Sequence, residues 1–180
     1  MDIFQSIVNW IRDGWTRLKP FFVVDAFETA GVLRVGKYHR TAGPGLHWKI
    51  PFADDPVEIT TVEQTWRSPA QPLTTKDDVA VTVMTVVRYS IRDVKPYITL
   101  IYDQEDVLAD RTMGLVRRLV AKSTYRELVD AEEPEKEIAT RLRRAVGKYG
   151  FEIEELTFTA FTKSRPLTLI TQSVLASLAN

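Results

Sequence analysis

Apolar side chains recur at helical spacing through the first 24 residues, with polar and basic residues elsewhere around the helix. Two tryptophans, and two phenylalanines after Pro20, are interleaved with arginine and lysine, a composition typical of helices at the headgroup boundary of a bilayer. We interpret residues 1–24 as an amphipathic membrane-associating segment. Its predicted lipid-contacting residues are Ile3, Phe4, Ile7, Trp10, Ile11, Trp15, Leu18, Phe21 and Phe22.

The same segment has a second interpretation. An amphipathic face can also pack on its own domain, on a sister subunit or on a partner protein. Asp13 and Gly14 within the segment argue against deep insertion into a bilayer. Both a membrane surface and a protein surface are therefore candidates for what this helix contacts.

From Phe27 the spacing of apolar residues changes towards alternation, which predicts strands. Three short strands are expected around residues 32–35, 46–50 and 57–66, joined by glycine, proline and aspartate turns. The clearest strand covers residues 79–91, where valine, threonine, tyrosine and isoleucine occupy alternate positions. Its other face is half apolar, which favours a central place in a sheet or cover by a helix.

The second half of the chain returns to helical periodicity before a last strand. Glycine at position 150 marks the end of the strongest helix. The expected elements are a short helical or irregular segment at 93–102, helices at 104–122 and 132–148, a capped turn at 123–128, and a strand at 151–162.

The apolar positions of this last strand move by one residue, from Phe151 and Ile153 to Leu156 and Phe158. Because side chains alternate between the faces of a strand, such a shift would turn the later ones to the wrong side. We therefore predict a β-bulge at Glu154–Glu155.

The C-terminal segment 166–180 has no charged side chain. It is expected to form a short apolar helix or an oligomerisation tail, because its apolar face is unsuited to water. Its predicted oligomer contacts are Leu167, Ile170, Val174 and Leu178.

The composition argues against several classes of function. Lysine plus arginine and aspartate plus glutamate each number 24, so the chain lacks the basic excess typical of nucleic-acid binding. The absence of cysteine removes disulfides, thiolate catalysis and the common structural zinc sites. No apolar run approaches the roughly 20 residues that span a bilayer, and no secretory signal pattern is recognised.

No catalytic constellation is recognised in the sequence. His39 and His47 flank the turn Gly43-Pro44-Gly45, but no third metal ligand stands at a recognisable spacing. The acid pairs Asp54-Asp55 and Asp77-Asp78 are interpreted as solvated turn formers. We expect neither a metal nor another cofactor.

Several segments carry a family resemblance: Gly36, the stretch 43–52 with its Gly-Pro-Gly turn, residues 73–77, and residues 150–154. In their order and spacing, residues 25–165 resemble the SPFH (Band 7) family, which includes stomatins, prohibitins and flotillins. The resemblance implies an α/β (α+β) domain with a β-rich half at 25–92 and a helix-plus-strand half at 93–165. It also implies membrane-attached homo-oligomers, often rings or cages.

This resemblance leads to an expected function. The chain should be a non-enzymatic, peripheral or monotopic scaffold on the cytoplasmic face of a membrane, which organises a membrane patch or encloses and regulates a protease or channel. Its expected partners are the bilayer surface, further copies of itself and such a client. Trp48 and Phe52, with Leu46 and Ile50, are predicted to extend the lipid-contacting surface. The alternative is a soluble interaction module whose N-terminal helix docks on a partner or sister subunit.

The arginines at 117–118 and 141–144 have two interpretations. They form a solvated helix face or an ion-pair face between subunits, rather than a phosphate-binding site.

Overall fold

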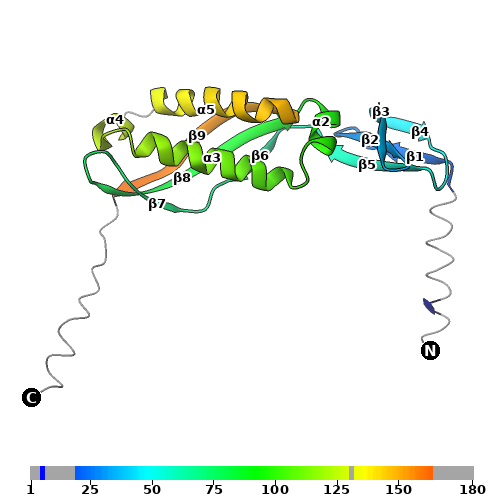
Figure 1. Ribbon diagram of the computed structural model, residues 1–180, viewed down its shortest axis with the longest axis horizontal. Coiled ribbons are helices and arrows are strands. Elements are labelled where there is room, and N and C mark those ends of the chain that lie inside the picture. The colour runs from blue at the N-terminus through cyan, green and yellow to red at the C-terminus, as the bar shows by residue number, and fades with distance from the viewer. Residues whose placement is uncertain (1–4, 7–18, 130–131, 164–180) are drawn as a thin grey trace, which may run out of the picture.

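The computed structural model describes residues 5–6, 19–129 and 132–163. Figure 1 shows an elongated molecule with strands alone at one end and helices packed on a second sheet at the other. This arrangement confirms the predicted α+β class and the order of a β-rich first half followed by helices and a final strand.

The all-strand end contains two small antiparallel sheets. One pairs β1 with β4, and the other has the order β3-β2-β5. The bounds are β1 (Phe21–Val24), β2 (Glu28–Arg34), β3 (Lys37–Ala42), β4 (Gly45–Trp48) and β5 (Asp54–Thr60). Five buried apolar residues form their shared core: Phe22, Val24, Ala30, Val32 and Ala42.

The structure corrects the predicted strands of this half. Strand β3 was not predicted, because Lys37–Ala42 is polar apart from Tyr38 and Ala42 and has no apolar alternation. The single strand expected at 57–66 is two strands, because the chain leaves one sheet at Thr60 and enters another at Gln64. Residues 21–24, predicted as the end of the amphipathic segment, form strand β1.

The second sheet is built around a long strand, as the alternating pattern predicted. Its strands are β6 (Gln64–Arg67), β7 (Gln71–Thr74), β8 (Ala80–Ile91) and β9 (Phe151–Lys163). β6 and β7 pair with successive parts of β8, and β9 pairs along its other edge. Strand β7 was not predicted, because it contains Pro72, which cannot donate a hydrogen bond and is tolerated only at a sheet edge.

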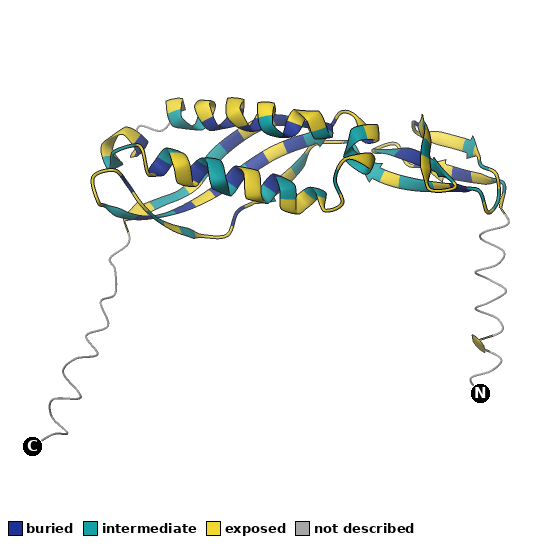
Figure 2. Ribbon diagram, in the orientation of Figure 1, coloured by how far each residue is buried: buried dark blue, intermediate teal, exposed yellow. Residues whose placement is uncertain are grey.

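Helices cover one face of this sheet. They are α2 (Val94–Thr99), α3 (Gln104–Val120), α4 (Tyr125–Val129) and α5 (Glu132–Val146), which continues into the 3-10 turn η1 (Gly147–Tyr149). α3 and α5 lie side by side (Figure 1), and Figure 2 shows that their surfaces towards the strands are buried. Leu108, Val116, Ile138 and Leu142 from the helices pack with the buried valines of β8. Burial of this apolar layer is the main source of stability.

The predicted bulge is confirmed. Arg88 pairs with Glu155 and Tyr89 with Ile153, so Glu154 has no partner on β8. α5 holds this irregular edge, because Arg143 donates to the carbonyl oxygens of Ile153 and Glu154, both at 2.7 Å. A second bulge at Thr159, where the pairing moves from Ala160 to Phe158, was not predicted.

Most of the predicted N-terminal helix and the predicted tail contacts at 166–180 lie outside the described residues. Within the described part of the chain, no helix combines the length and the apolar character needed to cross a bilayer.

Candidate functional site

The ribbon of β1 and β4 presents an apolar face to solvent. Phe21 lies opposite Trp48 and Val23 opposite Leu46, so the four side chains form two adjacent cross-strand pairs. Their residues are 44%, 72%, 59% and 65% exposed, respectively. A contiguous apolar surface of this kind is uncommon on a monomeric soluble protein and marks an interaction site.

The opposite face of the ribbon is packed. Strand alternation turns Phe22 into the core, so the prediction that it contacts lipid is wrong. The ring of Phe22 lies 5.6 Å from that of His47, and the guanidinium of Arg40 lies 6.0 Å from its centre. His47 Nε2 donates to the carbonyl oxygen of Gly43 at 2.6 Å, which fixes the proton on that nitrogen. This histidine therefore closes the turn that precedes it.

The Gly43-Pro44-Gly45 turn is a corner between sheets. The chain leaves β3 at Ala42 and starts β4 at Gly45, which pairs with β1 rather than with β3. Gly45 has a φ of 121°, a conformation that side chains with a Cβ rarely adopt. The turn thereby takes the chain from the β3-β2-β5 sheet into the ribbon of β1 and β4, which carries the exposed Trp48.

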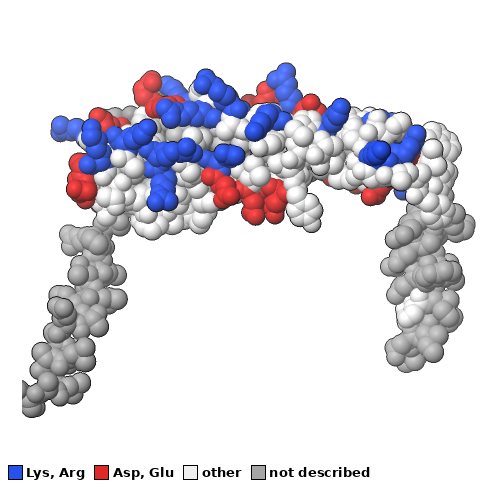
Figure 3. All heavy atoms as spheres, viewed as in Figure 1, with Lys and Arg blue, Asp and Glu red and all other residues white. Residues whose placement is uncertain are grey.

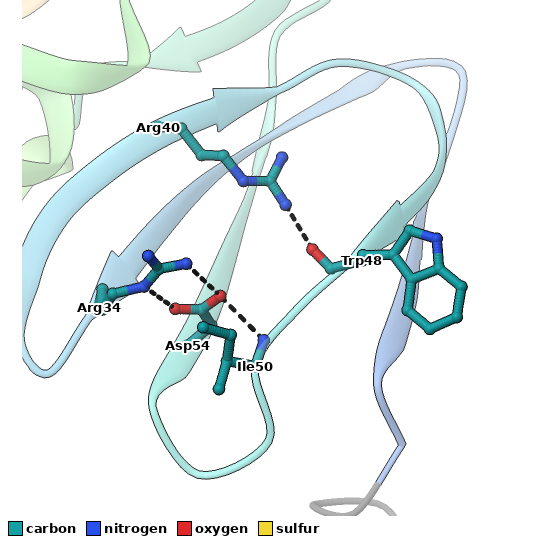
Figure 4. A network of polar contacts seen from close by, with 5 residues as sticks. All are labelled: Arg34, Arg40, Trp48, Ile50 and Asp54. Atoms are coloured by element: carbon teal, nitrogen blue, oxygen red, sulfur yellow. Dashed lines mark hydrogen bonds and ion pairs between the residues drawn. The ribbon is translucent and has the colours of Figure 1, made fainter.

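A buried carboxylate anchors the loop that follows β4 (Figure 4). Arg34 Nε and Nη2 donate to Asp54 Oδ1 and Oδ2 at 2.7 and 3.0 Å, and the amide of Ile50 donates to Oδ2 at 3.0 Å. The hydrogen bonds from Arg34 and then from Ile50 lower the pKa of Asp54 from 3.8 to about 2. Arg40 also donates to the carbonyl oxygen of Trp48. The prediction that Asp54 is a solvated turn residue is wrong.

Two exposed apolar side chains stand on strained backbone, Val35 in the turn between β2 and β3 and Phe52 in this anchored loop. Val35 and Phe52 have φ angles of 49° and 65°, and they are 81% and 79% exposed. The amide of Val35 donates to the carbonyl oxygen of Ala53 at 2.8 Å, which ties the two strained positions together. Backbone strain in bulky residues clusters at functional sites. The loop therefore presents Phe52 and Ile50 beside Trp48, and neither residue is packed in the core.

Together these residues are named the exposed apolar set: Phe21, Val23, Val35, Leu46, Trp48, Ile50 and Phe52. The sequence indicated five of them, whereas Val23 and Val35 were missed. Val23 could have been found from the Phe-Phe-Val-Val alternation, but the outward position of Val35 depends on the pairing of β2 with β5.

The other predicted acid pair has a structural role. Asp77 accepts hydrogen bonds from the Thr75 hydroxyl at 2.6 Å and from the Tyr125 amide at 3.0 Å, so it joins the β7–β8 turn to the start of α4. These bonds, the Thr75 bond first, lower the pKa of Asp77. Among residues 5–6, 19–129 and 132–163, no group of three or more histidine, aspartate or glutamate side chains could hold a metal ion.

The model of the SPFH domain / Band 7 family matches residues 22–165, which include every strand and helix from β2 to β9. The chain belongs to this family. Protein HflK of Vibrio cholerae is 33% identical over 105 residues, covering 57% of this chain and 26% of that protein. The modulator of FtsH protease HflK of Escherichia coli K12 is 27% identical over 120 residues, covering 66% and 27%.

A protein of Methanocaldococcus jannaschii, described only as uncharacterized, is 26% identical over 140 residues, covering 77% of this chain and 70% of its own length. The chain thus spans about a quarter of the length of the HflK relatives, at 26% and 27%. Within the SPFH domain, the matched range contains the whole exposed apolar set except Phe21. The candidate site is therefore part of the family domain itself.

Proposed function

We propose that this SPFH-domain protein is a non-enzymatic scaffold that attaches to a membrane surface, forms homo-oligomers and regulates a membrane protein. Residues 1–20 of the predicted amphipathic segment 1–24 and the exposed apolar set would both contact the bilayer. The tail residues Leu167, Ile170, Val174 and Leu178 are proposed to contribute contacts between subunits.

The exposed apolar set is the observation that supports membrane attachment. It includes two aromatic rings on one strand pair, Phe21 and Trp48, and the strained, exposed Phe52. Aromatic side chains are favoured at the headgroup boundary, because one side of the ring is apolar and the other can be wet. β1 also forms the last residues of the segment predicted to lie on the bilayer. The N-terminal segment and the exposed apolar set would therefore contact the same bilayer surface.

The names of relatives suggest the kind of client. The E. coli relative is called a modulator of FtsH protease. We propose by analogy that a membrane protease is a client of this chain, with a channel as the alternative client. Enclosing or organising a membrane patch is the mechanism that an oligomer on a bilayer would provide.

Flotation of the full chain with anionic liposomes tests the attachment. The double variant Trp48→Thr/Phe52→Asn removes two exposed rings, and asparagine tolerates the positive φ at position 52. We expect it to lower the bound fraction at limiting lipid by about tenfold or more, because each ring contributes at least about 1.5 kcal/mol when buried. Trp10→Glu/Trp15→Glu should abolish flotation.

The matched control is Val62→Thr, which changes a residue that is 49% exposed but lies outside the set. It should float like the unchanged chain. Flotation that survives both double variants would refute membrane attachment through these surfaces. A stable protein that ignores lipid from the outset would instead support the soluble interaction module.

A further inference from the structure

A groove lies between the C-terminal half of α3 and α5. Two contiguous hollows of ≈760 and ≈50 Å³ share Leu119, Glu137 and Arg141 in their walls. Leu115 and Ile138 add apolar surface next to Leu119. The larger hollow has the size in which proteins commonly bury small ligands or anchoring side chains, about 300–1,000 Å³.

The rim of this groove carries cations that lack carboxylate partners within the described chain. Arg118, Lys122 and Arg144 line the two hollows and are exposed, and no ion pair involves them among these residues. Arg141 is paired with Glu137, and Glu127 accepts from the amide of Thr124 at 2.8 Å. Figure 3 shows lysine and arginine gathered on this face over the helices.

The connection between α2 and α3 forms an exposed apolar projection. The start of α3 beside it is negatively charged, opposite in sign to the rim of the groove. Tyr102 is 100% exposed and Leu100 is 60% exposed. The first turns of α3 then present Glu105, Asp106 and Asp110, all exposed and without a cationic partner among the described residues. We name Leu100, Tyr102 and these three carboxylates the acidic knob. In Figure 3, acidic side chains gather beside the start of α3, apart from the basic area.

We propose that the acidic knob of one copy of this chain docks into the groove of the next copy. Tyr102 and Leu100 would fill the apolar floor, while Glu105, Asp106 and Asp110 would face Arg118, Lys122 and Arg144. This inference rests on the oligomer part of the proposed function and names the surfaces that build it.

The knob cannot fill the groove of its own chain. At about 1.5 Å per residue, Leu119 lies about 22 Å along α3 from the first residue of that helix. The two surfaces also differ from one another, so the contact is heterologous and leads to a closed ring or an open filament. In such an assembly each copy would present its groove to one neighbour and its acidic knob to the other.

A second copy fits this groove better than a bilayer does. A planar bilayer reaches the rim of a concave surface but not its apolar floor. The walls also carry Glu127, Glu133 and Glu137, but the cations Arg118, Lys122, Lys136, Arg141 and Arg144 outnumber them, so the groove still attracts carboxylates. A knob with a central tyrosine and flanking carboxylates matches both the floor and the rim.

Sedimentation of the lipid-free full chain tests the contact. The unchanged chain should associate, and association should weaken as salt rises, because exposed charges are screened. The groove variant Arg118→Glu/Arg144→Glu and the knob variant Glu105→Lys/Asp110→Lys should each raise the concentration at half-association by about tenfold or more. Tyr102→Ala should have the same effect without altering the fold, because its side chain is fully exposed.

Mixing the charge variants makes the test specific. In an equimolar mixture of the groove and knob variants, the unchanged knob of one meets the unchanged groove of the other, and the reversed knob meets the reversed groove. The mixture should therefore associate although each variant alone does not. A chain that carries all four changes should associate again as the unchanged chain does. The control Lys37→Glu/Arg67→Glu changes the net charge of the chain as the groove variant does, at exposed residues of β3 and β6, and should associate normally.

Several results would overturn the inference. These are a monomeric unchanged chain at low salt, association that persists in all single-surface variants, or failure of the fourfold variant to associate. Because no lipid is present, these outcomes are independent of flotation. A chain that floats but does not associate would refute the knob and groove alone.

Discussion

At the scale of single residues, Asp54 shows how a fold assigns different roles to identical side chains. Asp54 and Asp55 are adjacent in the sequence and chemically the same, yet Asp54 is 7% exposed and Asp55 is exposed. The difference arises from the pairing of β2 with β5, which places Arg34 opposite Asp54. Arg34 lies 20 positions away in the chain, so local sequence patterns could not predict this buried pair.

We expect Asp54→Asn to lower the free energy of unfolding by about 1–3 kcal/mol at neutral pH, because the Arg34 guanidinium loses its carboxylate partner. The folded-state pKa of Asp54 is lowered to about 2 from 3.8, so its contribution is complete above pH 4 and falls as the pH drops towards 2. Denaturant titrations across this range measure both effects.

The difference between the unchanged protein and Asp54→Asn should therefore shrink on acidification. Asp55→Asn is the matched control and should change stability by no more than about 0.5 kcal/mol. A difference between the two proteins that stays constant from pH 7 to pH 2 would contradict this assignment of the carboxylate.

At the scale of elements, the spacing of apolar residues predicted the helices and strands whose own sequence has the matching period. It missed the strands that form only through pairing with their neighbours. The long strand β8, helices α3 and α5, and the bulge at Glu154 follow from the spacing of apolar residues. Strands β3 and β7 do not, because their sequences are polar or interrupted by proline, and their neighbours alone make them strands.

Gly150 connects α5 and η1 to β9 and was predicted only as a helix end. Its φ is 90°, and its carbonyl oxygen accepts from the amides of Arg92 and Asp93 at 2.9 and 3.3 Å. A Cβ at this position would clash with the carbonyl of Asp93. We expect Gly150→Ala to lower the free energy of unfolding by about 2 kcal/mol or more, measured by thermal or denaturant unfolding.

The matched control for that change is Gly147→Ala, three residues earlier. A Cβ there would meet nothing within 4 Å, and its φ is not positive. This variant should be neutral or stabilising by up to about 1 kcal/mol, because alanine is the better helix former. Equal losses of stability for Gly150→Ala and Gly147→Ala would show that the close approach of the Asp93 carbonyl is not what requires glycine at position 150.

At the scale of the whole molecule, the sequence predicted the order of the SPFH domain but not the separation of its surfaces. The exposed apolar set lies at the all-strand end, whereas the groove lies among the helices at the other end (Figure 1). The Arg117-Arg118 run was open to two interpretations, because its neighbours across the α3–α5 groove are set by tertiary packing. Two separated surfaces allow membrane attachment and self-association to operate at the same time.

Attachment and association should then reinforce each other. An oligomer that presents several apolar sets binds a vesicle more tightly than a monomer, and such multivalency can raise overall affinity by roughly 10²–10⁴-fold. Tyr102→Ala leaves the exposed apolar set unchanged, because Tyr102 lies in the α2–α3 connection. We expect this variant to float about tenfold less at high protein density, where the unchanged chain associates, and to lose the steep rise of binding with protein concentration. Flotation over a range of protein-to-lipid ratios measures this, with Val62→Thr as control. Identical curves for Tyr102→Ala and the unchanged chain would mean that single copies bind the bilayer without help from their neighbours.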